Sequence, residues 1–319
     1  MKRLSVLLVC FAAASGWAQT YPSHAVKVIV PWTPGQATDI AARVVAQKLQ
    51  DALGQPFVID NKPGAGGSIG TDAVVKSAPD GYTLLAASSG PLSIMPHLQK
   101  TPYEPLRDLA PVSLVAATPF ALVVHPSFPA ADAKEFIAMI KADPAKYTFS
   151  SSGTGATAHL FTELFNSMAG IRGVRHVPYK GSAPALTDIM NGQITYTVET
   201  VAATAPHIKS GRLKTYGVST AQRTAALPDV PPLAESAGLA GYDAAAWIGY
   251  AAPAGTPREV LGRLSAEIQK ALQSPELKER MVNIGLDAVA STPDEMAAFM
   301  RREEERYGAI IKAANIRLE

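Results

Sequence analysis

The sequence predicts an α/β protein with two lobes, parallel-rich sheets, two strands that cross between the lobes and a cleft between them. Its 319 residues favour two domains over one, at roughly 100–200 residues per domain. Strand and helix patterns alternate near the N-terminus and again in the middle third of the chain. Such alternation is typical of parallel sheets covered by helices, which bind ligands beyond the carboxyl ends of their strands.

The first residues have the pattern of a signal peptide. Lys2 and Arg3 precede the apolar run Leu4–Ala14, which is shorter than the roughly 20 residues needed to span a bilayer. Small residues then precede a cleavage site expected after Ala18, so residues 1–18 are predicted to be removed. Removal of Lys2 and Arg3 lowers the Lys+Arg count from 29 to 27, against 27 Asp+Glu. The only cysteine, Cys10, leaves with them, so the exported chain is expected to be neutral and without disulfides.

The first third of the remaining chain alternates strands and helices. The predicted strands are Val26–Val30, Phe57–Ile59 and Tyr82–Ala87, and the predicted helices are Ala41–Leu53, closed by Gly54, and Ile69–Lys76.

The middle third repeats this order, and the last third is mostly helical. The predicted strands are Phe120–Val124, Tyr147–Ser150, His176–Tyr179 and Ile194–Val198. The predicted helices are Ala133–Ala142, one with Phe161 and Phe165 on its apolar face, one opened by Lys180–Pro184, and finally Pro257–Gln273, Pro275–Ile284 and Pro293–Ala314, with a short strand near Leu286–Ala290.

The chain is expected to enter the second lobe near Pro119 and to return near Ala246–Tyr250. The predicted limits are therefore 19–119 and 247–319 for a discontinuous first lobe, and 120–246 for the second. Two crossing strands between lobes form a hinge with a cleft.

The sequence gives little support for hydrolase catalysis, metal binding or nucleic-acid binding. Gly66-Gly67-Ser68-Ile69-Gly70 matches the nucleophile elbow of hydrolases, but a loop separates Ser68 from the preceding strand where the elbow needs a sharp turn. A secreted serine hydrolase using Ser68 stays the alternative. The six histidines are scattered without metal-ligand spacing, so no metal and no cofactor are expected. A net charge of +2 without a basic block argues against nucleic-acid binding.

One arrangement recurs: a strand, a loop of small or hydroxyl residues, and then the start of a helix. Free backbone N–H groups and the helix dipole favour anions, carboxylates included, at such positions. Their convergence on one cleft would form an anion-binding pocket. These segments are Trp32–Asp39, Ser89-Gly90, Ser151–Gly155 and Gly181–Pro184. His159, in the first turn of one of these helices, could line the cleft or be an ordinary surface histidine.

A set of motifs spread over nearly the whole exported chain resembles the Bug-type extracytoplasmic solute receptors of tripartite tricarboxylate transporters. The motifs are Tyr21-Pro22, Val30–Gly35 with Asp39 and Ala42-Arg43, Asn61–Gly67, Asp80–Leu84, Ser152–Gly155 with His159, Val177–Gly181, and Trp247–Gly249 through Ala252–Pro257.

The resemblance implies a two-lobe periplasmic binding protein, not an enzyme, that closes on a small carboxylate and delivers it to a membrane permease. A receptor that signals through a sensor kinase is the other possibility. A monomer is expected, and mono- and dicarboxylates are favoured over tricarboxylates, acidic amino acids and aromatic acids.

The resemblance also implies which residues contact the ligand. From the first lobe these are Trp32, Thr33, Gly35, Thr38 and Asp39, and from the second lobe Thr154, Gly155, His159, Tyr179, Lys180, Gly181 and Glu199. Ser89 is added to the expected contacts because it lies at one of the recurring helix starts. Two positions depart from the family pattern: Gln36 stands where a second glycine is usual, and Glu199 where an aspartate is common.

Overall fold

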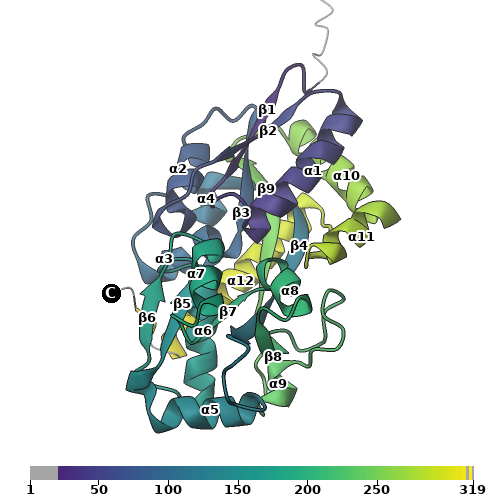
Figure 1. Cartoon of the computed structure of the whole chain (residues 1–319). Coiled ribbons are helices and arrows are strands. Elements are labelled where there is room, and N and C mark those ends of the chain that lie inside the picture. The colour runs from purple at the N-terminus through teal and green to yellow at the C-terminus, as the bar shows by residue number, and fades with distance from the viewer. Residues whose placement is uncertain (1–20, 314–315, 318–319) are drawn as a thin grey trace, which may run out of the picture.

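The computed structural model describes residues 21–313 and 316–317, so the predicted signal peptide and its cleavage site lie outside the described residues. The described strands are β1 (Val26–Val30), β2 (Phe57–Asn61), β3 (Thr83–Ser88), β4 (Leu109–Val124), β5 (Thr148–Ser151), β6 (Arg175–Pro178), β7 (Tyr196–Thr200), β8 (Lys214–Val218), β9 (Ala245–Pro253) and β10 (Asp287–Ala288). They form one sheet in the order β2-β1-β3-β9-β4-β7-β5-β6, with β8 and β10 also pairing with β4 (Figure 1).

Helices cover this sheet and divide into those before, within and after the second lobe (Figure 1). They are α1 (Ala37–Leu53), α2 (Ser68–Val75), α3 (Met95–Leu98), α4 (Pro105–Asp108), α5 (Ala133–Ala142), α6 (Thr157–Ala169), α7 (Ser182–Met190), α8 (Val201–Lys209), α9 (Leu233–Ser236), α10 (Arg258–Gln273), α11 (Pro275–Asn283) and α12 (Pro293–Ala313). Short helical turns lie at η1 (Ala65–Gly67), η2 (Gly90–Ile94) and η3 (Pro144–Lys146).

Successive side chains of β1 enter two different hydrophobic cores of the first lobe. Val28 and Val30 pack with residues of α1, α10 and α11, whereas Ile29 packs on the opposite face with residues of α2 and α12. Both neighbours of β1, namely β2 and β3, run parallel to it. Burial on both faces explains why this strand is a continuous apolar run in the sequence.

The two crossing strands are β4 and β9, and they confirm the predicted fold class. β4 pairs with β9 from Leu109 to Pro119, and then with β7 from Phe120 to Val124 and with β8 from Ala121 to Val124. The sequence indicated only this second half of β4 as a strand. One strand enters the second lobe and the other returns, so all their pairings are antiparallel and the sheet is mixed, with parallel pairs confined to the outer strands.

The second lobe repeats the two-sided burial. Phe120, Leu122 and Val124 of β4 enter one core with residues of α5 and α6, while Ala121 and Val123 enter another with residues of α7 and α8. β7 begins later than predicted, at Tyr196, because the N–H groups of the two residues at 193 and 194 bond back to Asp188 at the end of α7.

The C-terminal helix α12 contributes to both lobes. Met296 and Met300 lie in a core of the first lobe, whereas Tyr307 and Ile311 lie in the core of the second lobe that contains Phe161. The rings of Tyr307 and Phe161 stack with their centres 6.1 Å apart. The predicted limits of the lobes, which place all of α12 in the first, stay a prediction.

Candidate ligand-binding cleft

Two connected cavities lie between the lobes. The inner cavity has an empty volume of about 430 Å³ and the outer one about 990 Å³. Trp32 and Gln36 of the first lobe and Ser152 and Ala156 of the second line both cavities, which are therefore the deep part and the mouth of one cleft.

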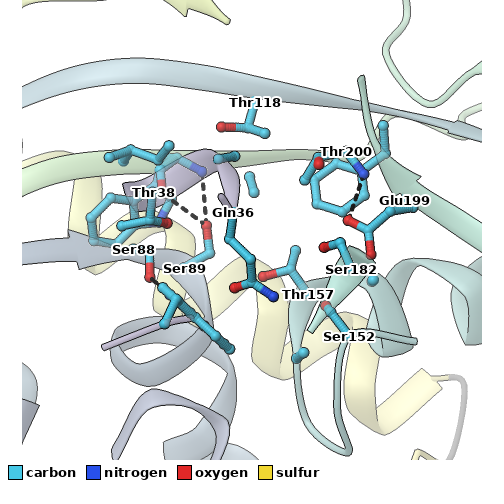
Figure 2. Close-up of a pocket in the computed structure, with 18 residues that line it drawn as sticks. Gln36, Thr38, Ser88, Ser89, Thr118, Ser152, Thr157, Ser182, Glu199 and Thr200 are labelled. Atoms are coloured by element: carbon cyan, nitrogen blue, oxygen red, sulfur yellow. Dashed lines mark hydrogen bonds between the residues drawn. The ribbon is translucent and has the colours of Figure 1, made fainter. Parts of the chain in front are cut away.

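The inner cavity has a wall from each lobe and a floor from the crossing strands. Figure 2 shows Thr38, Ser88 and Ser89 on one side and Ser182, Glu199 and Thr200 on the other. Its lining residues are Trp32, Gln36, Ala37, Thr38, Ser88, Ser89, Thr118, Phe120, Ser152, Ala156, Thr157, Ala158, Ser182, Glu199, Thr200, Ala246, Trp247 and Ile248.

On the first-lobe wall, the loop after β1 leads directly into α1. Pro31 ends β1, and α1 begins at Ala37 with no side chain capping its N-terminus. The first N–H groups of α1 thus have no side-chain acceptor at the cavity wall. The Trp32 indole donates a hydrogen bond of 2.9 Å to the Ser88 hydroxyl, which holds the ring against the end of β3.

Asp39 shapes this loop from behind the cavity. It is 2% exposed, and its carboxylate accepts hydrogen bonds from the Gly35 N–H at 2.9 Å, Arg43 at 3.0 Å and Asn61 at 2.8 Å. Burial alone would raise the pKa of Asp39, but the hydrogen bonds from Arg43, Gly35 and Asn61 lower it overall. Asp39 is therefore a buried anion committed to Gly35, Arg43 and Asn61, and it lines neither cavity.

The second-lobe wall is built from further helix starts. α6 begins after Ala156 and α7 after Gly181, again with no side chain capping either N-terminus. By contrast, α8, which begins at the same wall, is capped by Thr200, whose hydroxyl accepts a hydrogen bond from the Ala203 N–H. Three uncapped helix N-termini, from α1, α6 and α7, thus border the cleft.

The outer cavity is lined by several second-lobe residues that were predicted to contact the ligand. Thr154, Tyr179, Lys180 and Gly181 line it together with Thr33 of the first lobe. The Tyr179 hydroxyl donates to Asp188 at 2.6 Å, and burial together with that carboxylate raises the pKa of Tyr179 to about 12. Tyr179 therefore presents its ring to the cavity as a neutral phenol.

His159 lies behind the cleft wall. It is 5% exposed, its Nδ1 atom accepts a hydrogen bond of 3.2 Å from the Gly155 N–H, and its ring stacks on His176 at 4.0 Å. Burial lowers the pKa of His159 to about 4, so the ring is neutral at pH 7. It lines neither cavity and instead fixes the loop before α6.

Ser89 on the first-lobe side and Thr118 on the floor differ in their hydrogen bonding. The Ser89 hydroxyl accepts a hydrogen bond of 2.8 Å from the Trp247 N–H of β9, which ties the end of β3 to the crossing strand. Thr118, on β4, is 1% exposed, and its hydroxyl has no hydrogen-bond partner among the described residues. A polar ligand group is the natural partner for such an atom, because buried polar groups are almost always hydrogen-bonded.

Glu199, at the end of β7, is the only ionisable side chain that lines the inner cavity within the described part of the chain. It is 1% exposed, and one carboxyl oxygen accepts a hydrogen bond of 2.7 Å from the Thr200 N–H. Burial raises the pKa of Glu199, although the Thr200 N–H and the hydroxyls of Ser182 and Thr200 oppose the rise. The nearest cationic lining residue, Lys180, belongs to the outer cavity.

The surroundings of Ser68 differ from those of a catalytic serine. It is the first residue of α2, it is buried, and its hydroxyl accepts a hydrogen bond of 3.2 Å from Tyr103 rather than bonding to a histidine. η1 stands between β2 and α2, so the sharp strand-to-helix turn of a hydrolase elbow is not formed there.

The structure thus sorts the predicted ligand contacts into three groups. Trp32, Thr38, Ser89 and Glu199 line the inner cavity; Thr33, Thr154, Tyr179, Lys180 and Gly181 line only the outer one; Gly35, Asp39, Gly155 and His159 line neither. The prediction omitted Gln36, Ser88, Thr118, Ser152, Thr157, Ser182 and Thr200, which line the inner cavity. Gln36, Ser152 and Ser182 lie within the segments predicted to form the anion-binding pocket, whereas Ser88 and Thr157 lie just outside those segments.

Two further searches cover the described residues. None of the helices within 21–313 combines the length and hydropathy needed to cross a membrane. The same part of the chain contains no group of three or more His, Cys, Asp or Glu side chains placed to hold a metal ion.

The two lobes, the crossing strands and the cleft define the class of two-lobe solute-binding proteins. The chain belongs to the tripartite tricarboxylate transporter family receptors, whose family model matches residues 41–316. The family resemblance seen in the sequence motifs is therefore confirmed, and the family is periplasmic.

Three similar proteins illustrate this relationship. BugT of Bordetella pertussis (strain Tohama I) is 39% identical over 329 residues, which span 100% of this chain and 99% of BugT. The structure of R. palustris Rpa4515 with adipate has a TM-score of 0.89 and 34% identity, covering 93% of this chain and 99% of that one. MatC from Rhodopseudomonas palustris with bound malate has a TM-score of 0.85 and 30% identity, covering 91% of this chain and 100% of that one.

Proposed function

We propose that this protein captures a small carboxylate in the inner cavity and delivers it to a membrane permease of the tripartite tricarboxylate type. The protein acts in the periplasm as a monomer, after removal of residues 1–18. The observation that carries the proposal is the set of three uncapped helix N-termini at a cavity whose lining, among residues 21–313, includes no lysine, arginine or histidine.

Helix N-termini can hold a carboxylate without a cationic side chain. Their free N–H groups donate hydrogen bonds, and the helix dipole favours negative charge at that end. Here α1 supplies one such end from the first lobe, and α6 and α7 supply two from the second. The ligand's carboxylate therefore has donors in both lobes only when the lobes lie close together, so its binding energy favours the closed form. The carboxylates bound in two relatives, adipate and malate, support this ligand class.

Thermal unfolding with a panel of carboxylates tests the binding function. A ligand that binds only the folded protein stabilises it, by about 2.7 kcal/mol when the ligand concentration is 100 times its Kd, and so raises the melting temperature. We expect at least one mono- or dicarboxylate to do so, while its uncharged amide of the same length does not. A panel in which no carboxylate shifts the melting temperature, or in which the amides shift it equally, contradicts the proposal.

Deletion of the gene from its host tests delivery. Uptake of the binding carboxylate should fall while induction of genes by that carboxylate persists. Normal uptake with lost gene induction would instead assign the protein to signalling through a sensor kinase.

A further inference from the structure

The second-lobe side of the inner cavity contains a buried carboxyl oxygen without a partner. Glu199 accepts the Thr200 N–H through one oxygen, but its Oε2 atom has no hydrogen-bond partner among the described residues. The side chain is 1% exposed and lines the cavity, so the ligand is the group that can reach it.

The charge state of Glu199 follows from what surrounds it. A carboxylate transferred from water to a buried site costs several kcal/mol unless a cation and further hydrogen bonds compensate it. The described lining of this cavity offers no cation, and the Thr200 N–H and the nearby hydroxyls of Ser182 and Thr200 only partly offset the cost of burying the carboxyl. Burial without a neighbouring cation therefore favours the neutral, protonated form of Glu199 in the free protein, and this form can donate a hydrogen bond.

Hydroxyl groups add to this donor. Figure 2 shows Ser182 beside the Glu199 carboxyl, and Ser182 also lines the cavity. Thr118 on the floor has a hydroxyl that no other described residue bonds, and it can turn its proton toward a ligand. This side of the cavity thus offers several hydrogen-bond donors and no positive charge.

We propose that Glu199 is a specificity-determining residue that donates its proton in a hydrogen bond to a second carboxylate of the ligand, so that the cavity selects dicarboxylates. This inference rests on the proposed function, because the first carboxylate occupies the helix N-termini. The donated proton stays in the hydrogen bond between Glu199 Oε2 and a ligand oxygen, so the second carboxylate needs no positively charged side chain. A hydrogen bond from a neutral O–H group to a charged carboxylate oxygen is short and is stronger than a hydrogen bond between two neutral groups.

Calorimetric titration with matched ligands tests the inference. Each of succinate, glutarate and adipate is compared with the monocarboxylate and the ω-amino acid of the same chain length. The wild-type protein should bind at least one of the dicarboxylates ten or more times more tightly than its monocarboxylate and its ω-amino acid.

Two variants then assign that preference to the Glu199 proton. Glu199→Gln keeps a donor at this position and should retain the dicarboxylate preference within about threefold. Glu199→Met has a similar size and no polar group, so the preference should fall at least tenfold, while its apolar side chain suits the buried position. Glu235→Gln, at an exposed position on α9, is the matched control and should bind like the wild type.

The outcomes separate the two proposals. If monocarboxylates and dicarboxylates bind equally, or if ω-amino acids bind best and Glu199→Gln abolishes their binding, the inference is wrong although carboxylate binding stands. The second result would mean that Glu199 is ionised and pairs with an ammonium group. If no ligand with a carboxylate binds, the proposed function itself fails.

Discussion

At the scale of single residues, two stacked histidines couple the stability of the second lobe to pH. His159 and His176 lie with nearly parallel rings 4.0 Å apart, and Phe149 stacks on His176 at 4.8 Å. Burial lowers the pKa of His159 to about 4, and burial and the charge of His159 lower the pKa of His176 to about 3. Both rings are therefore neutral in the folded protein at pH values where an unfolded chain binds protons on histidine, below about 6.5.

The stability of the protein should consequently fall as the pH drops from about 6.5 toward 4. In this window the unfolded state binds more protons than the folded state, so the free energy of unfolding decreases with decreasing pH. Each fully buried histidine contributes at most about 1.4 kcal/mol per pH unit. His176 is partly exposed and contributes less. Urea unfolding of His159→Phe between pH 7.5 and 5 should show a shallower slope than the wild type.

His24→Phe serves as the control for this measurement, because His24 is an exposed histidine stacked on Tyr82. The His159 variant also removes the acceptor for the Gly155 N–H, which lowers stability at every pH without changing the slope. Equal slopes for the wild type and the His159 variant would show that this ring is not the group that titrates.

The position of His159 could not be predicted from the residues near it in the chain. Its place in the first turn of α6 was predictable, but the sequence allowed the side chain either to line the cleft or to lie on the exposed surface. The ring is buried because it stacks on His176, a residue of the next strand in the sheet, and because it caps the Gly155 N–H. Such contacts depend on which strands become neighbours, which local patterns do not encode.

At the scale of secondary-structure elements, the start of α7 lies against the first lobe. Gly181, which precedes α7, has a φ of +117°, and a Cβ atom added there would lie 2.7 Å from the Thr33 hydroxyl across the cleft. This is closer than real Cβ contacts, so with alanine at this position the Thr33 side chain would have to turn away or the two lobes would have to separate.

Gly181→Ala should therefore weaken carboxylate binding at least tenfold, because the added methyl group opposes closure. Gly153→Ala is the matched control for backbone strain, since Gly153 also has a positive φ, +140°, but its added Cβ would meet only the Tyr179 carbonyl at an ordinary 3.5 Å. Adding Thr33→Ala to Gly181→Ala removes the hydroxyl that clashes and should restore most of the affinity. An equal loss for both glycine variants, without rescue, would mean that backbone strain alone is responsible.

The elements themselves were largely predictable, with one instructive exception. Apolar runs buried on both faces and glycines that close helices, such as Gly54 after α1, indicated most strands and helices. The first half of β4 was missed because small and polar residues such as Ser113 and Thr118 interrupt it. Those residues are needed at the crossing: Ser113 bonds to Ser291 at 2.7 Å, and Thr118 lines the cavity floor.

At the scale of the whole molecule, the cleft should narrow when a carboxylate binds. Ligand groups in both lobes gain their contacts together only in the closed form, so ligand shifts the population toward it. Small-angle X-ray scattering should show a smaller radius of gyration with the ligand than without it. Gly181→Ala, under the same ligand saturation, should contract less. Identical scattering curves for the wild type with and without ligand would contradict closure.

The arrangement of the whole molecule could be predicted in outline from the sequence. Length, the two blocks of alternating elements and the two crossing strands indicated two lobes around a cleft. The role of α12 could not be predicted, because its amphipathic pattern shows which face is buried but not that Met300 and Tyr307 are buried in different lobes.

The path of α12 has a consequence for how the protein unfolds. The Tyr307 hydroxyl donates a hydrogen bond of 3.0 Å to the Ala245 carbonyl at the start of β9, and the same helix supplies core residues to each lobe. If either lobe melted, α12 would lose half of its packing and the other lobe would be left with an open core. The two lobes are thus expected to form one cooperative folding unit, in which heat or denaturant produces a single transition even though the lobes move apart to admit a ligand.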